Sequence, residues 1–169
     1  MNILLVDGYN MVGAWPELQR LKDKDLGQAR DKLVGMLAEY AAYTGYDVKV
    51  VFDAHMVSGI GKAYHTHRVD VIYTKNKETA DERIEKLARE LKRIDRVIYV
   101  ATSDMAEQSV VFGSGALRKS AKELLIETEL ASKRIDKMVQ KTKFVQESSK
   151  ISLSKEVAEI FEKWRRGDK

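Results

Sequence analysis

The sequence contains no cysteine and only one proline, Pro16, among its 169 residues. Without cysteine the chain cannot form a disulfide, a thiolate zinc site, an iron–sulfur cluster or a cysteine nucleophile. It also has no apolar run of the roughly 18 residues that a membrane-spanning helix needs, and no signal-peptide pattern at its N-terminus. We therefore expect a cytoplasmic protein without membrane association, in which any metal ion has mainly oxygen ligands.

Three common functional motifs are also missing. There is no G-x-x-x-x-G-K-[ST] sequence, which argues against a P-loop NTPase. The pair Gly59-Ile-Gly61 lacks the third glycine of a dinucleotide-binding turn, and no G-x-S-x-G sequence is present to suggest a serine hydrolase.

The composition is that of a folded domain, with 44% hydrophobic and 33% charged residues. The net charge of +4 is unevenly distributed, because residues 1–117 carry 16 basic and 17 acidic side chains while residues 118–169 carry 14 and 9. A surplus of +5 in the last third favours a surface for a polyanion. A solvated helical face rich in lysine is an equally good explanation of the charge alone.

Strand-like and helix-like segments alternate along the chain, which predicts an α/β domain around a parallel sheet of about four strands. We expect a helix over residues 25–43 and a second helix that begins at a capping box at Thr79. A third helix of about 25 residues is expected to begin at Ala116, and a fourth to cover residues 155–166. We expect one domain over 1–143, then a short linker and a C-terminal helix over 144–169 packed on that domain. Residues 54–68 are expected to form a loop and residues 105–112 a short helix. The strands are expected over residues 2–6, 48–52, 69–73 and 97–101.

Aspartates stand at the ends of three predicted strands. Asp7, Asp53 and Asp104 lie at the carboxyl ends of these strands or within three residues of them, and Asp81 lies in the first turn of a helix after the third strand. Because such ends meet at one edge of a parallel sheet, we expect the four carboxylates to converge. Each one alone is more simply a turn or capping residue, but together they favour a Mg²⁺ or Mn²⁺ site that activates water on a phosphodiester. Asn10 either positions Asp7 or sits in a turn.

The segment Gly113-Ser-Gly115 precedes the predicted long helix, with Arg118 and Lys119 in what would be its first turn. A glycine-rich turn at a helix N-terminus suits a phosphate, although a plain linker explains it equally well. Trp15 is one of the aromatic side chains that either stack on unpaired bases or belong to the core. The basic residues that we assign to RNA or ribosome binding are Arg118, Lys119, Lys122, Arg134, Lys137, Arg165 and Arg166.

The whole chain resembles the YacP-like NYN-domain proteins, a bacterial branch of the PIN-like nuclease superfamily. The resemblance rests on MNILLVDGYNMVGAWPEL, VVFDAH, ETADERIEKLA, ATSD, FGSGALRKSAKELL and FEKWRRGD, of which VDGYN and TADERIE are the most specific. The family includes a ribosome-associated A-site endoribonuclease. The resemblance implies a three-layer PIN-like fold and an RNase site at Asp7, Asn10, Asp81 and Asp104, with Asp53 as a further metal ligand.

The resemblance also implies a partner, the translating ribosome, and a substrate, mRNA cleaved in or near the A site. We therefore expect a monomeric, divalent-metal-dependent endoribonuclease involved in mRNA decay. A non-catalytic RNA- or ribosome-binding protein with the same fold is the main alternative. A small-molecule phosphohydrolase with Asp7 as nucleophile is a weaker one, because such enzymes commonly have a second acid two residues later, where this chain has Tyr9.

Overall fold

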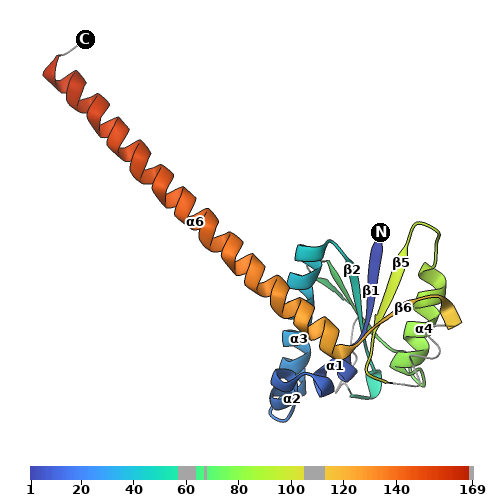
Figure 1. Ribbon diagram of the computed structural model, residues 1–169. Coiled ribbons are helices and arrows are strands. Elements are labelled where there is room, and N and C mark those ends of the chain that lie inside the picture. The colour runs from blue at the N-terminus through green and yellow to red at the C-terminus, as the bar shows by residue number, and fades with distance from the viewer. Residues whose placement is uncertain (57–63, 67, 105–112, 168–169) are drawn as a thin grey trace. The chain divides into compact units, whose positions relative to one another are not determined.

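The structure, a computed structural model, describes residues 1–56, 64–66, 68–104 and 113–167 (Figure 1). The chain divides into two compact units, Met1–Ser132 and Lys133–Lys169. The first unit contains the sheet and every candidate metal ligand, and the second is helical. The short helix expected over residues 105–112 lies outside the described residues.

A six-stranded sheet forms the middle layer of the first unit, in the order β3-β4-β2-β1-β5-β6. Five strands run parallel, and only β3 is antiparallel to its neighbour β4. The four predicted strands are confirmed, but the two three-residue strands at the edges were not expected. The strands are β1 Asn2–Asp7, β2 Asp47–Phe52, β3 Tyr64–Thr66, β4 Val69–Tyr73, β5 Val97–Ala101 and β6 Leu117–Lys119.

The expectation of a loop throughout 54–68 is wrong at two places. A short 3₁₀ helix, Ala54–Met56, follows β2, and β3 pairs antiparallel with β4. Arg68, directly before β4, has a φ of 71°, in the left-handed region that is uncommon for residues other than glycine. Three residues are too few to show a period of two, so the sequence pattern alone does not reveal such an edge strand.

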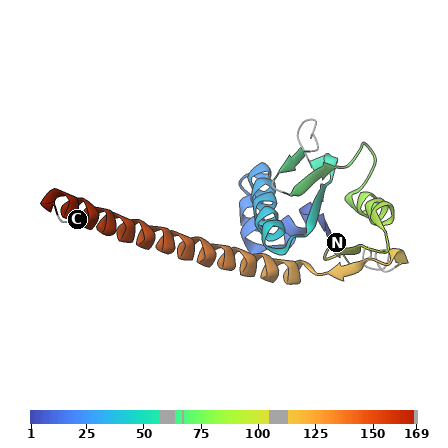
Figure 2. The same cartoon turned by 90° about the horizontal axis from the view of Figure 1, so that it is seen from above.

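Helices cover both faces of the sheet and complete three layers (Figures 1 and 2). Helices α1 (Gly8–Ala14), α2 (Pro16–Lys22) and α3 (Leu26–Thr44) lie on one face, and α4 (Ala80–Leu91) lies on the other. The central strand β1 packs Leu4 and Val6 against the first group and Ile3 and Leu5 against α4. This alternation is why β1 reads as a continuous apolar run.

Helix α6 runs from Ala121 to Arg166. It begins five residues later than predicted, because residues 117–119 form β6. The predicted linker at 144–150 is wrong, since the helix continues through it; the hydroxyl of Ser148 donates to the carbonyl of Phe144 (2.8 Å), which lets serine remain in a helix. The unit boundary falls after Ser132, not after residue 143. That residues 144–169 pack on the domain stays a prediction.

The second unit exposes large apolar side chains along its helix. Examples are Phe144, Phe161 and Trp164, and the last two rings form an edge-to-face pair. Among the helices that the structure describes, none is both long and apolar enough to cross a membrane.

Candidate functional site

The four aspartates lie at the carboxyl edge of the parallel strands, as the sequence predicts. Asp7 is the last residue of β1, Asp53 follows β2, and Asp104 comes three residues after β5. Asp81 is the second residue of α4, the helix that follows β4. Because β2, β1 and β5 are adjacent and parallel, their ends deliver three of these side chains to neighbouring positions.

Asp7 is the buried member of the group, with 8% of its surface exposed. The pKa of its carboxyl is raised to about 6, chiefly by burial; a hydrogen bond from the backbone of Asn10 works against this rise, and the charges of Asp81, Asp104 and Asp53 contribute to it. This bond, from Asn10 N to Asp7 Oδ1 (3.2 Å), makes Asp7 the N-cap of α1. The first acid of the site therefore also begins a helix.

Gly8 allows the chain to turn into α1 beside the aromatic core. A Cβ atom at this position would lie 2.3 Å from Cε1 of Phe52, which is fully buried. The Phe52 ring packs edge-to-face against Tyr9 and in a tilted arrangement against Tyr73. Asp7 is thus held between a sheet end and a close-packed aromatic cluster.

Threonine side chains hold the backbone of the residues that follow Asp81 and Asp53. Thr79 and Glu82 form the predicted capping box of α4, with Glu82 N to Thr79 Oγ1 at 3.2 Å and Thr79 N to Glu82 Oε2 at 3.0 Å. Partial burial of the Asp81 carboxyl raises its pKa, and the charges of Asp104 and Asp53 act in the same direction. After β2, the backbone N–H of Ala54 donates to buried Thr74 (2.9 Å), which ties the Asp53 turn to the end of β4.

Asn10 and Thr102 position the loop that carries Asp104. The backbone N–H and the hydroxyl of Ser103 both donate to Oδ1 of Asn10, at 2.8 and 2.6 Å. The backbone N–H of Asp104 donates to Thr102, which is fully buried (3.1 Å). Asn10 therefore contacts the chain at Asp7 through its backbone and at Ser103 through its side chain. Thr74 and Thr102 were not singled out from the sequence, although each directly follows a predicted strand.

The carboxylates influence one another, but they do not form a complete metal site. In the described part of the chain, no three histidine, aspartate or glutamate side chains are placed close enough together to hold an ion. The donor set nevertheless fits a hard divalent cation, because all four side chains offer carboxylate oxygens and because repulsion from the other three adds to the effect of burial on the pKa of Asp7. Asp7, Asp53, Asp81 and Asp104 are the residues that would hold it.

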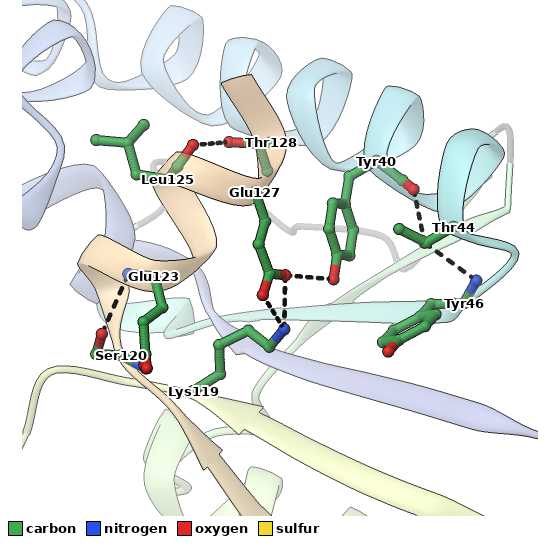
Figure 3. A network of polar contacts seen from close by, with 9 residues as sticks. All are labelled: Tyr40, Thr44, Tyr46, Lys119, Ser120, Glu123, Leu125, Glu127 and Thr128. Carbon is green, nitrogen blue, oxygen red and sulfur yellow. Dashed lines mark hydrogen bonds and ion pairs between the residues drawn. The ribbon is translucent and has the colours of Figure 1, made fainter. Parts of the chain in front are cut away.

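The predicted basic residues fall into different environments. Lys119 is buried at the end of β6, and its ammonium forms an ion pair with Glu127 (2.6 Å), which also accepts from the hydroxyl of Tyr40 (2.8 Å) (Figure 3). Lys119 also lies 5.2 Å from the centroid of the Tyr99 ring. This lysine joins β6, α6 and α3, which gives it a structural role. Its assignment to RNA binding stays a prediction.

The glycine-rich segment also differs from the expectation. Gly113-Ser-Gly115 leads into a strand, so Arg118 and Lys119 are not in the first turn of a helix. Arg118 and Lys122 are exposed in the first unit, and in the second unit the side chains of Arg134, Lys137, Arg165 and Arg166 are exposed. Trp15 is a core residue, since it is 1% exposed and its indole N–H donates to the carbonyl of Ala121 (2.8 Å).

Comparisons with known proteins agree with this architecture. Residues 4–166 match the family model of the YacP-like NYN domain. The chain is 58% identical over 168 residues to an uncharacterised Bacillus subtilis protein named YacP, covering 99% of both chains. A crystal structure of B. subtilis Rae1 (YacP) superposes with a TM-score of 0.80 at 58% identity, covering 99% of this chain and 97% of the other. A W164L mutant of the same protein gives a TM-score of 0.73 at 57% identity, covering 82% of this chain and 81% of the other.

Proposed function

This chain belongs to the YacP-like NYN domain family, and on that premise we propose that it is a divalent-metal-dependent endoribonuclease that cleaves mRNA in the A site of translating ribosomes. NYN domains are nuclease domains of the PIN-like type, and membership therefore supports a nuclease as the kind of enzyme. The metal, the RNA substrate and the ribosome belong to the proposal.

One observation carries the proposal: a buried carboxylate lies within the electrostatic influence of three others at the edge of a parallel sheet. A chain that only needed turns and helix caps there would gain nothing from burying Asp7 near Asp53, Asp81 and Asp104, because each added charge opposes ionisation of the others. A divalent cation removes this repulsion. Perturbed carboxylates grouped at a strand edge are typical of functional sites.

In the proposed reaction Asp7, Asp81 and Asp104 would hold Mg²⁺ or Mn²⁺, with Asp53 assisting. When bound, such an ion would supply positive charge for the phosphodiester oxygens and would lower the pKa of a water molecule that attacks phosphorus. Asn10 keeps the Asp104 loop in register with Asp7 through its two contacts with Ser103. No side chain needs to form a covalent intermediate.

The basic side chains support the polyanionic partner. Residues 133–169 carry 11 lysines and arginines against 6 acidic residues, a net charge of +5, whereas residues 1–132 carry 19 against 20. Within the basic unit, Arg134, Lys137, Arg165 and Arg166 are the side chains that we assign to mRNA or ribosomal RNA. Arg166 also forms an ion pair with Glu162 (3.2 Å), and a solvated pair of this kind is weak enough to exchange for a phosphate.

The test is mapping of mRNA cleavage on translating ribosomes, with and without a chelator, for the wild type and for Asp7→Asn and Asp81→Asn. We expect cleavage by the wild type alone, its loss in chelator, and unchanged folding and ribosome binding of both variants. Full activity of either folded variant would overturn the site.

The main alternative, a non-catalytic RNA- or ribosome-binding protein, predicts salt-sensitive binding without cleavage and without any effect of chelator. Turnover of a small phosphate ester in the absence of any RNA cleavage would favour a phosphohydrolase instead. The same set of reactions therefore separates the three functions.

A further inference from the structure

A hollow of about 510 Å³ lies directly beside the acidic edge, between the end of α1 and the junction of β6 with α6. Its apolar lining, which we call the wall, includes Ala14, Pro16 and Leu125, and its polar lining, which we call the rim, includes Ser103, Arg118 and Lys122. Most of the exposed lining is apolar. The volume is within the roughly 300–1,000 Å³ range of small-ligand pockets in proteins.

The sheet topology explains why this hollow adjoins the site. Strand β6 is parallel to β5, with Lys119 in register with Ala101, so residues 120–122 emerge at the same edge as Thr102, Ser103 and Asp104. Ser103, which lines the hollow, precedes Asp104 and donates both of its hydrogen bonds to Asn10. A ligand in the hollow therefore lies next to the loop that carries one of the acids.

The two cations on the rim are available for an anion. Arg118 and Lys122 are exposed, and neither forms an ion pair with any side chain that the structure describes. The carboxylate of the nearby Glu123 accepts a hydrogen bond from the backbone N–H of Ser120 (2.7 Å), and the backbone N–H of Glu123 donates to the Ser120 hydroxyl (3.1 Å). This reciprocal cap holds the turn between the two cations.

We propose that this hollow is a nucleotide subsite: it takes the base of a single-stranded RNA nucleotide next to the scissile phosphate against its apolar wall, while Arg118 and Lys122 contact the flanking phosphates. An apolar wall with cations on its rim matches a nucleotide, whose base is apolar on its faces and whose phosphates are anionic. The subsite rests on the proposed function, because it assigns a position in the substrate of that same site. It would set where the RNA lies relative to Asp104.

The test is equilibrium binding of a short 5′-fluorescein-labelled oligouridylate to the full-length Asp81→Asn protein, which is expected to bind without cleaving. Ala14→Leu fills the hollow without altering charge, and it should weaken binding about tenfold while the dependence on salt stays the same. Arg118→Gln with Lys122→Gln should weaken binding and reduce the slope of log K against log salt by about 0.7 for each phosphate that is no longer neutralised.

The matched control is Lys86→Gln with Arg93→Gln, which removes two exposed cations away from the carboxyl edge and should change affinity less than about twofold. An oligouridylate with 4-thiouridine should crosslink to the segments around residues 14–16 or 120–125. Unchanged affinity of Ala14→Leu, or an equal decrease in the control, would overturn the subsite.

The outcomes also separate the subsite from the proposed hydrolysis. Binding that depends on the hollow, together with no cleavage by the wild type on ribosomes, leaves the subsite standing and removes the nuclease function. Normal cleavage by Ala14→Leu and by the Arg118/Lys122 variant, with unchanged affinity, removes the subsite alone.

Discussion

At the scale of single residues, Asp7 is where stability and the proposed function conflict. Its pKa is raised from 3.8 to about 6, so between these two values the unfolded chain loses its proton before the folded one does. The folded protein therefore becomes progressively less stable as the pH rises from about 4 to 6. A shift of about 2 units corresponds to at most roughly 3 kcal/mol.

We accordingly predict that Asp7→Asn stabilises the metal-free protein at pH 7. The gain in unfolding free energy should be up to roughly 3 kcal/mol at pH 7 and should disappear below about pH 3, where the carboxyl is neutral in both states. Urea denaturation in the presence of a chelator, measured across this pH range, tests it. Added Mg²⁺ or Mn²⁺ should restore the stability of the wild type and have less effect on the variant. A gain independent of pH would contradict the assigned cause.

Gly8 supports a second prediction at this scale. Gly8→Ala should lower the unfolding free energy by about 1–3 kcal/mol, because the added methyl group would overlap the buried ring of Phe52. Gly13→Ala, in the same helix, is the matched control: a Cβ there meets no atom within 4 Å, so it should be neutral or stabilising. Thermal unfolding of the two variants measures the difference in stability. An equal loss of stability in both would show that the close contact with Phe52 is not the cause.

At the scale of elements, the capping box of α4 connects local stability to the site. Thr79→Ala removes the oxygen that accepts from Glu82 N, and removal of a cap of this kind costs about 1 kcal/mol. Because Asp81 lies in the same turn, cleavage should decrease together with stability. Thr142→Ala, whose hydroxyl only donates to Met138 within α6, should change neither quantity. Chemical denaturation measures the stability of both variants, and the ribosome cleavage assay on the same samples measures their activity.

The junction of β6 with α6 supports a prediction about two neighbouring cations. Lys119→Met should destabilise the protein by about 1–3 kcal/mol, because it removes the half-buried ion pair with Glu127. Arg118→Met, on the same strand but exposed, should leave stability within about 0.5 kcal/mol and weaken RNA binding instead. Chemical denaturation and oligonucleotide binding of both variants provide the measurement, and a reversal of the two phenotypes would show that the assignments are exchanged.

At the scale of the whole molecule, the two units differ in charge, with a net −1 in residues 1–132 and +5 in residues 133–169. We predict that replacing Arg134, Lys137, Arg165 and Arg166 together with glutamine weakens ribosome binding and reduces its salt dependence, by a slope of up to about 3 if each contacts one phosphate. Cosedimentation with ribosomes over a salt series measures this. The control replaces four exposed cations of the first unit, Lys22, Lys24, Lys86 and Arg93, and should leave the slope almost unchanged.

Features that depend on neighbouring residues can be predicted from the amino-acid sequence alone. The apolar runs predicted the four central strands, the Thr79–Glu82 spacing predicted the cap of α4, and the strand ends predicted the edge at which four aspartates gather. These signals are local, because strand burial, helix capping and the direction of parallel strands each follow from a few consecutive residues.

Features that depend on partners distant in the chain follow only from how the elements pack together. Strands β3 and β6 exist because β4 and β5 offer free edges, and three residues carry no period that could reveal them. Asp7 is buried by residues from several elements. The contact between Asn10 and Ser103 and the pairing of Lys119 with Glu127 likewise connect separate elements. Charge type can be read from a sequence, but whether a charge faces water, a partner or a ligand follows only from packing.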